Sequence, residues 1–288
     1  MDQLAPGVYV DTSCRGSNPG AIITEEGAVI VDTPQIPEEA RRMRAEVEAL
    51  SNGKPILYVI NTDHHRGHIL GNQWFKPAPV IAHDIAWKHM KGYTENFKQR
   101  VYDSYKREPE IQKQFEDLEI VTPTITFSHR LFLTLGDTEI RVIWVGGHTP
   151  ATSIVWLPRQ RVVFVGDTVW VDQHPYMAQA DSKEWLDALT YIRRLDAEYI
   201  VPGHGPVCGR EATERISEYI RAMRSRVRSM FKAGKSKQET AAALAPEFID
   251  WFPIVPERKS RLESQIKSGI NRVWTEFQRG DEEEEEWE

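Results

Sequence analysis

Residues 61–72 have the sequence N-T-D-H-H-R-G-H-I-L-G-N and hold three of the nine histidines of this 288-residue chain. They follow a continuous apolar run at 55–62, which is typical of a strand covered on both faces. Polar residues in a turn directly after a buried strand lie where layered folds collect their functional side chains. This stretch therefore predicts a central strand and the beginning of a functional site.

Three more stretches place a histidine or an aspartate directly after a predicted strand. They are G-G-H-T-P-A-T at 146–152, V-G-D-T at 165–168 and V-P-G-H-G-P at 201–206. Imidazole and carboxylate groups are the ligands that zinc accepts, and they also suit iron and manganese. The two cysteines, Cys14 and Cys208, are far apart in sequence, so neither a cysteine-based zinc site nor a disulfide framework is indicated. We expect a metal site built from histidine and aspartate side chains.

Strand and helix patterns alternate along the chain in two blocks. The first block has predicted strands at 7–13, 21–32, 55–62 and 80–82, and the second at 125–135, 139–145, 152–157, 161–165 and 199–201. Amphipathic helices are predicted to begin at Pro37 and near Asp181. Two blocks of strands with helices outside predict an α/β sandwich of two sheets flanked by helices.

The helical parts of the chain suggest how it is organised. Residues 85–118 are charged, aromatic and helical in period, which predicts a helical insertion that either packs on the body or caps a site. Further helices are predicted at 211–231 and 257–277, and S-K-Q-E at 236–239 has the pattern of a capping box. We expect a domain at 1–210, a helical extension at 211–280 and an acidic, disordered end at 281–288.

Charge and hydropathy limit the classes of partner. The net charge is −7, and residues 281–288 alone carry seven acids and no base, so the rest of the chain is neutral and lacks the overall positive charge typical of nucleic-acid-binding proteins. No apolar run approaches the ~18 residues of a membrane span, and the first residues lack the pattern of a secretory signal. We expect a cytoplasmic protein that acts on a small molecule. The helices after 211 would form a homodimer interface or cover one edge of the sandwich.

In order and spacing, the four motifs resemble the metal motifs of the metallo-β-lactamase-fold hydrolases. The resemblance covers about 7–207 and includes V-I-V-D-T at 29–33. It implies a four-layer αββα sandwich of two mixed sheets, with a metal site at the edge between them and extra helices at the C-terminal end. Within this family, the chain resembles the hydroxyacylglutathione hydrolase-like and lactonase-like members.

The resemblance also implies which residues bind metal. The first motif of the family is His-x-His-x-Asp-His, and residues 63–68 are D-H-H-R-G-H. His65 and His68 match this motif, whereas Asp63 replaces its first histidine and Gly67 replaces its aspartate. The ligands implied by the four motifs are Asp63, His65, His68, His148, Asp167 and His204.

The departure at Asp63 and Gly67 leaves three interpretations open. The first ion would be held by His65, His148 and Asp167, with Asp63 as a further candidate. The second would keep His68, His204 and Asp167 without its own carboxylate. In one interpretation Asp63 supplies that carboxylate and two ions bind. In another the second site is weak and one ion binds, and in the third the site has only a binding or structural role.

The expected chemistry is that of a metal-dependent hydrolase. A bound divalent ion, most simply Zn²⁺, with iron or manganese as alternatives, lowers the pKa of its water and supplies hydroxide at neutral pH. Asp167 would bridge the ions and orient the nucleophile, and Asp63 would add charge or accept a proton.

The substrate class follows from the resemblance. True β-lactamases of the family commonly have cysteine or serine where this chain has Asp167, so an ester, thioester or lactone is the expected substrate. Five residues near the motifs are candidates for a substrate pocket: His64, Arg66, Trp170, His174 and Tyr176.

Two further functions compete with hydrolysis. One is an iron-dependent oxygenase that resembles the persulfide dioxygenases of this fold, for which His65, His148 and Asp167 would hold a single ion. The other is a non-catalytic binding protein. Iron content with oxygen uptake would favour the former, and failure to retain any metal would favour the latter.

Overall fold

The computed structural model describes residues 1–254 and 256–285, with side chains as far as Gly280. The chain divides into two compact units. The first consists of Met1–Trp144, Ala151–Asp167 and Asp196–Cys208, and the second of Val145–Pro150, Thr168–Leu195 and Gly209–Glu288. Two segments from within the expected 1–210 domain therefore group with the C-terminal helices.

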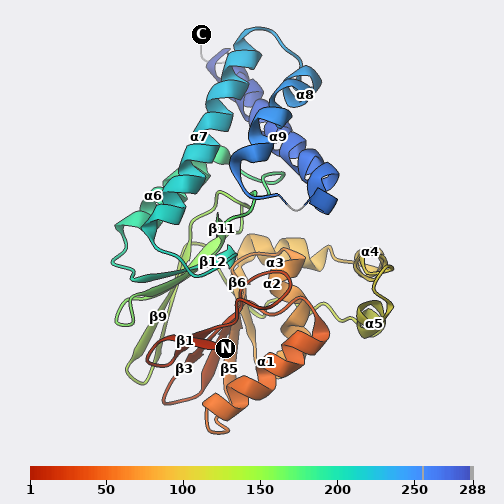
Figure 1. Cartoon of the computed structure of the whole chain (residues 1–288). Coiled ribbons are helices and arrows are strands. Elements are labelled where there is room, and N and C mark those ends of the chain that lie inside the picture. The colour runs from red at the N-terminus through yellow and green to blue at the C-terminus, as the bar shows by residue number, and fades with distance from the viewer. Residues whose placement is uncertain (255, 286–288) are drawn as a thin grey trace. The chain divides into compact units, whose positions relative to one another are not determined.

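The first unit contains a seven-stranded sheet in the order β1 to β7 (Figure 1). Its strands β1 to β4 pair antiparallel, and β4 to β7 pair parallel, so the sheet is mixed. The strands are β1 (Asp2–Ala5), β2 (Val8–Val10), β3 (Gly20–Ile23), β4 (Ala28–Val31), β5 (Ile56–Ile60), β6 (Val80–His83) and β7 (Ile125–Phe127).

A second sheet has the strand order β12-β11-β10-β9-β8, and its strands β8 to β11 pair antiparallel. The strands are β8 (Arg130–Leu135), β9 (Thr138–Trp144), β10 (Ser153–Leu157), β11 (Val162–Trp170) and β12 (Tyr199–His204). β11 and β12 are longer than expected, so Asp167 lies within a strand and His204 at the end of one, rather than in the turns that follow.

The two sheets pack face to face around one hydrophobic core, as predicted. Val29 and Val31 of β4 belong to this core together with Val142 of β9 and Val155 of β10. The side chains between them on β4, such as Ile30, face the opposite side, as the two-residue period of a strand requires. The polar residues at the strand ends are thus held by strands that are buried on both faces.

Helices of this unit pack on the outer face of the first sheet and on its loops. Met43 and Val47 of α1 pack on the outer face of this sheet. The predicted insertion forms α3, α4 and the short α5, and its residues Met90 and Val101 pack against Ile69 beside the first motif. The helices of this unit are α1 (Pro37–Leu50), α2 (Arg66–Ile69), α3 (Asp84–Lys91), α4 (Glu95–Ser104) and α5 (Pro109–Gln112), with 3₁₀ turns η1 (Leu70–Phe75) and η2 (Lys113–Phe115).

The second unit is mainly helical. Its helices are α6 (Ser182–Arg194), α7 (Arg210–Lys232), α8 (Lys237–Phe248) and α9 (Lys259–Glu285), with 3₁₀ turns η3 (Ile249–Trp251) and η4 (Pro256–Arg258). The capping box of Ser236 and Glu239 is present at the start of α8. α9 continues through Glu285, whereas a disordered end was expected from residue 281; residues 286–288 lie outside the described part.

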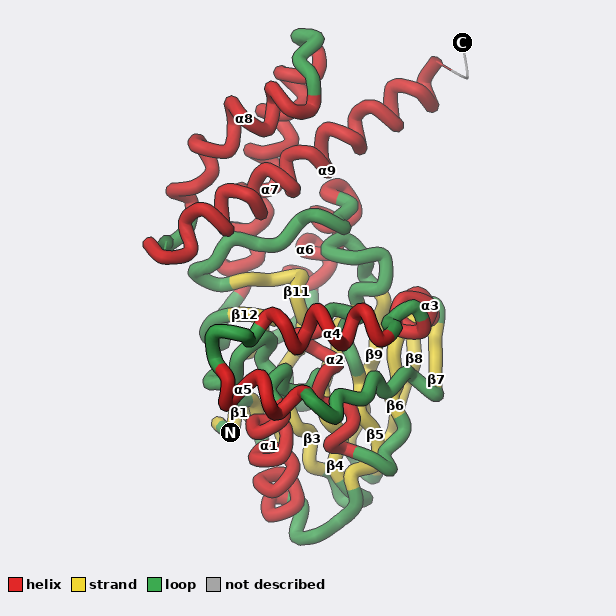
Figure 2. Tube along the Cα trace, turned by 90° about the vertical axis from the view of Figure 1, so that its right-hand side faces the viewer, coloured by secondary structure: helices red, strands yellow, loops and turns green. Residues whose placement is uncertain are grey.

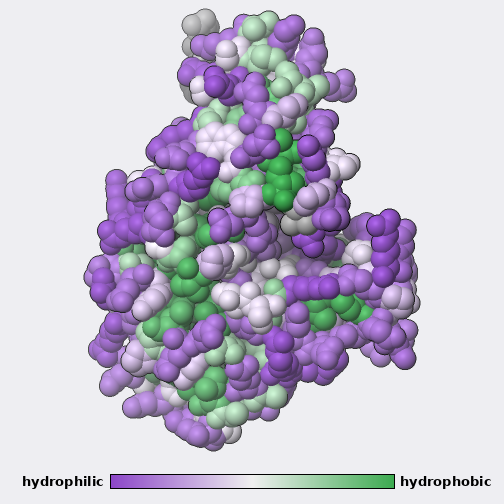
Figure 3. Space-filling model, viewed as in Figure 1, coloured by the Kyte–Doolittle hydropathy of each residue, from purple (hydrophilic) through white to green (hydrophobic). Residues whose placement is uncertain are grey.

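The surface has no large apolar area on the face seen in Figure 3, where hydrophobic residues occur in small separate areas among hydrophilic ones. Among the described helices, none has the length and apolar content needed to cross a membrane.

Candidate metal centre

The turn after β5 holds the first two candidate ligands, Asp63 and His65. Both carboxylate oxygens of Asp63 are engaged: Oδ1 accepts a hydrogen bond from the backbone N–H of His65 at 2.6 Å, and Oδ2 lies 3.0 Å from His65 Nδ1. Asp63 is 1% exposed. This turn presents a buried carboxylate and an imidazole side by side at the start of α2.

Three more candidates meet around one oxygen atom. His68 Nε2 and His204 Nε2 each lie 3.2 Å from Oδ1 of Asp167. The three side chains come from α2, β11 and β12, which are distant in sequence, and each offers one ligand atom within 4.8 Å of the others. These three side chains could together hold a cation.

Asp167 also belongs to a second group. Asp63, His65 and Asp167 each offer a ligand atom within 4.8 Å of one another. Asp63 thus belongs to the same group as His65. The Oδ1 atom of Asp63 is also 4.0 Å from His68 Nε2. The arrangement places Asp167 between the two groups, where the resemblance assigns the bridging ligand.

The donor atoms fit a divalent cation. His68 is 1% exposed, and its Nε2 atom has no hydrogen-bond partner among the described residues, although Asp167 Oδ1 is 3.2 Å away. A buried ring nitrogen without a hydrogen bond is costly. A cation between imidazole nitrogens and a carboxylate oxygen removes that cost, and this donor set is one that zinc prefers.

The orientation of His68 is fixed by a residue that sequence reasoning did not identify as part of the site. Asp32 Oδ2 lies 2.8 Å from His68 Nδ1, on the far side of the ring from Asp167. Asp32 is itself held by the backbone N–H and the hydroxyl of Thr62, at 2.8 and 2.7 Å. Its position in V-I-V-D-T, directly after β4, is the signal that could have identified it, since that is how the other site carboxylates were found.

Opposite charges dominate the electrostatics of this centre. Burial by itself would raise the pKa of Asp63, but His65 and His68 outweigh burial and hold this pKa below its usual range. For Asp167, His204 and His68 likewise overcome burial and keep the pKa well below the usual range. Burial opposes protonation of His68, but Asp32, Asp63 and Asp167 raise the pKa of its imidazole well above the ordinary value. These carboxylates require positive charge beside them, which protons or a metal ion can provide.

Two glycines allow the strand ends to approach each other. A Cβ on Gly203 would lie 2.1 Å from Asp167 Oδ1, and a Cβ on Gly166 would lie 2.5 Å from Thr62 Oγ1. Gly166 also has a φ of +49°, which other residues rarely adopt. Any side chain at Gly203 would displace the shared carboxylate.

His148 belongs to the second unit, in the loop after β9. This loop is held by the first turn of α6, since Gly147 N–H donates to Glu184 Oε2 at 2.8 Å and the Gly147 carbonyl accepts from Asp181 N–H at 2.8 Å. The ring of His148 lies 5.1 Å from that of Trp185. The contact of Glu184 with Gly147 was not predicted from the sequence.

Two of the predicted pocket residues contact the helical insertion. His64 is buried, its ring stacks on His89 of α3 at 4.2 Å, and its carbonyl accepts a hydrogen bond from Tyr93. Arg66 donates to the Ser104 hydroxyl at 3.4 Å. The insertion therefore lies against the first motif, and its role as a cap remains a prediction.

The other three predicted pocket residues lie in the second unit. His174 is buried, its Nε2 donates to the Ile249 carbonyl at 3.0 Å, and its ring contacts Phe252. Trp170 is half-buried at the end of β11, whereas Tyr176 is exposed. In this unit, His174 links the segment after β11 to the helices, and the substrate contacts of all three residues remain predictions.

The fold and the motifs together define a class of protein. The sequence model of the Metallo-beta-lactamase superfamily matches residues 12–204, a span that contains every candidate ligand. The chain belongs to this superfamily. The predicted fold class, the αββα sandwich, is thereby confirmed.

Individual relatives are distant. The chain is 25% identical over 244 residues to "Beta-lactamase-like protein 2 homolog" of Caenorhabditis elegans, covering 81% of this chain and 70% of that protein. It is 25% identical over 234 residues to "Linear primary-alkylsulfatase" of a Pseudomonas species, covering 68% of this chain but only 43% of that protein. A solved structure of a metallo-beta-lactamase family protein from Thermus thermophilus has a TM-score of 0.67 at 18% identity, covering 97% of this chain and 95% of that one.

Proposed function

We propose that this protein is a metal-dependent hydrolase that cleaves an ester, thioester or lactone of a small molecule. The observation that carries the proposal is the sharing of Asp167 Oδ1 by His68 and His204, beside the buried pair of Asp63 and His65. A purely structural aspartate would not need two imidazole nitrogens directed at one oxygen atom. Membership of the superfamily supports the same conclusion.

The residues around Asp167 would hold the metal, most simply Zn²⁺. His68, Asp167 and His204 form one set, and Asp63, His65 and Asp167 form the other. His148 is a further ligand in this proposal, on the strength of its sequence motif alone. The bound cation would lower the pKa of a water molecule to about 7 and polarise the carbonyl of the substrate.

Each residue of this centre has a distinct role in the proposal. Asp167 belongs to both sets, so it would serve as a ligand in either of them. Asp32 orients His68, so that its Nε2 atom faces the cation. His65 and His68 hold the pKa of Asp63 below its usual range, so its carboxylate would be available as a metal ligand and as an acceptor of a hydrogen bond from the nucleophile.

The test combines metal analysis with a panel of substrates. The protein is purified without chelator, its metals are determined by elemental analysis, and hydrolysis of an acyl thioester, a lactone and an aryl ester is measured. We expect more than one equivalent of metal and activity on at least one acyl substrate, both lost in His68→Ala and Asp167→Asn. His129→Gln, which changes an exposed histidine of the same unit, serves as the control. Metal-free protein that is inactive on the whole panel would contradict the proposal.

One comparison favours a second substrate class. The similarity to a linear primary-alkylsulfatase suggests an alkyl sulfate ester, whose cleavage the same centre could support. A medium-chain alkyl sulfate therefore belongs in the panel, with release of inorganic sulfate as the measurement. Iron as the main metal, with oxygen uptake on a persulfide, would instead indicate a dioxygenase.

A further inference from the structure

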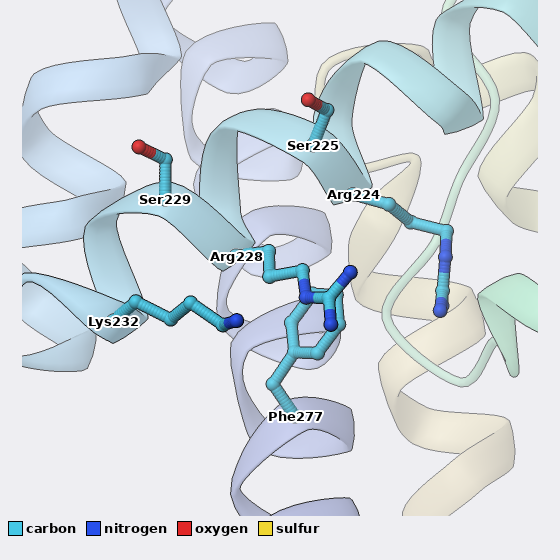
Figure 4. A pocket seen from close by; sticks show the side chains of 6 residues that line it. All are labelled: Arg224, Ser225, Arg228, Ser229, Lys232 and Phe277. Atoms are coloured by element: carbon cyan, nitrogen blue, oxygen red, sulfur yellow. The ribbon is translucent and has the colours of Figure 1, made fainter.

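The second unit contains a pocket of about 420 Å³ between α7 and α9 (Figure 4). Five of its six lining residues belong to α7 and one to α9: Arg224, Ser225, Arg228, Ser229, Lys232 and Phe277. Arg224, Arg228 and Lys232 are each four residues apart, so they form one face of the helix with successive Cβ atoms roughly 6 Å apart. We call these three residues the basic face of α7.

The basic face lies in a part of the sequence whose charged residues are all positive. Residues 221–238 contain seven lysines and arginines and no acid. Arg224 is paired with Glu276 at 3.2 Å. Among the side chains that the structure describes, neither Arg228 nor Lys232 takes part in an ion pair, and both are exposed. The pocket therefore retains uncompensated positive charge.

The wall formed by α9 is fixed in place. Arg224 lies over the ring of Phe277 at 5.2 Å, and Glu276 accepts a hydrogen bond from the backbone N–H of Ser182 at 3.0 Å. Phe231 of α7 contacts Trp274 and Phe277. These contacts hold α9 against α7 in this unit, so the pocket is formed before any partner binds.

The sequence contains a segment of opposite charge that begins four residues after Phe277. Residues 281–288 hold seven acids and no base. The α9 helix continues through Glu285, and Figure 2 shows its last turns extending past the other helices of the unit. Because a helix advances about 1.5 Å per residue along its axis, α9 carries the backbone of residues 281–285 away from the pocket of its own chain.

We propose that the acidic segment at 281–288 of one molecule docks into the basic face of α7 of a second molecule, forming a homodimer. Acidic residues at a spacing of four, such as Asp281 and Glu285, match the spacing of Arg224, Arg228 and Lys232. Each copy has one acidic segment and one pocket, so a two-fold axis satisfies both. Exposed ion pairs are individually weak and are screened by salt, so the dimer is weak and sensitive to salt.

Sedimentation velocity at several protein concentrations tests this proposal. We expect the full chain to dimerise in 50 mM salt and to dissociate in 500 mM salt, and we expect a chain that stops after Gly280 to be monomeric in both. Arg228→Glu with Lys232→Glu should give the same loss of dimer. Lys106→Glu with Arg107→Glu, an equal charge change at exposed residues of the first unit, is the control and should dimerise like the unchanged chain.

A mixing experiment separates lost contacts from lost folding. The chain that stops after Gly280 retains its pocket, and the chain with both substitutions retains its acidic segment, so one docking contact can form when the two are mixed. Heterodimers detected with a fluorescent label on one partner would support the proposal, because misfolded partners would not restore association. Two results would overturn the proposal. One is a full chain that is monomeric in 50 mM salt, as expected if its own acidic segment fills the pocket. The other is a dimer that still forms after truncation at Gly280 and after the double substitution Arg228→Glu with Lys232→Glu.

Discussion

Oδ2 of Asp32 lies 2.8 Å from Nδ1 of His68, and this contact determines which ring nitrogen faces the candidate metal position. Asp32 has a φ of +55°, a conformation that asparagine also tolerates. We therefore expect Asp32→Asn to fold normally but to bind metal at the His68 group ~10–100-fold more weakly, because a neutral amide orients the imidazole less strongly. Competition with a coloured chelator measures the affinity. Asp137→Asn, at an exposed turn, should leave it unchanged.

Gly67 permits a direct test of the altered first motif. A Cβ at Gly67 would meet its nearest neighbour, Ser17 N, at 3.5 Å, which is an ordinary contact. We expect Gly67→Asp to restore the carboxylate that the family motif has at this position and to tighten binding of the second ion. Titration with zinc, followed by elemental analysis, measures the stoichiometry. Gly67→Asn has the same shape without the charge, and an equal effect of both substitutions would disprove a ligand role for the new carboxylate.

Asp63 should contribute to metal binding through the first group. Because Asp63 lies with His65 and Asp167, Asp63→Ala is expected to lose part of the bound metal while His68 and His204 retain the rest. Elemental analysis of the purified variant gives the ratio of metal to protein. Full occupancy in this variant would show that Asp63 is not a ligand.

Gly203 is the position where steric effects on the centre are largest. Its Cβ would lie 2.1 Å from Asp167 Oδ1 and 2.7 Å from the backbone of Gly166, so Gly203→Ala must move a strand end. We expect a loss of about 1–3 kcal/mol in the free energy of unfolding together with loss of metal. Urea unfolding with and without zinc separates the two effects. Gly280→Ala, where a Cβ meets nothing within 4 Å, is the matched control.

His174 predicts how the stability of the second unit depends on pH. Burial lowers the pKa of its imidazole below the ordinary value of 6.5, and the neutral ring donates to the Ile249 carbonyl. The unfolded chain therefore binds a proton more readily, so stability falls as the pH drops below about 6.5, by at most about 1.4 kcal/mol per pH unit. Between pH 7.5 and 5, the midpoint temperature of thermal unfolding should decrease less in His174→Asn than in the unchanged chain. His129→Gln should retain the full decrease, since His129 is exposed.

The parts of the fold set by local pattern could be predicted from the sequence. The helix that begins at Pro37 and the capping box at Ser236 are each determined by a few neighbouring residues, and both are present. The motif residues His68, Asp167 and His204 were found because each comes shortly after a predicted strand, although Asp167 lies within β11 in the structure.

Contacts between distant segments could not be predicted in this way. Asp32 and His68 are 36 residues apart in sequence, and no periodicity relates them. Glu184 has the pattern of a helix start, and only the folded chain shows that its carboxylate holds Gly147. The helix at 281–285 also differs from the disordered end that seven clustered acids favoured.

The hydrogen bonds between the start of α6 and the His148 loop matter for engineering of this loop. Two backbone contacts of Gly147, to Glu184 and Asp181, anchor that loop to the start of a helix rather than to its own neighbours in sequence. Within the second unit, the position of this loop therefore depends on where α6 begins, so insertions or deletions in the connection at 171–180 are expected to shift the loop and α6 together.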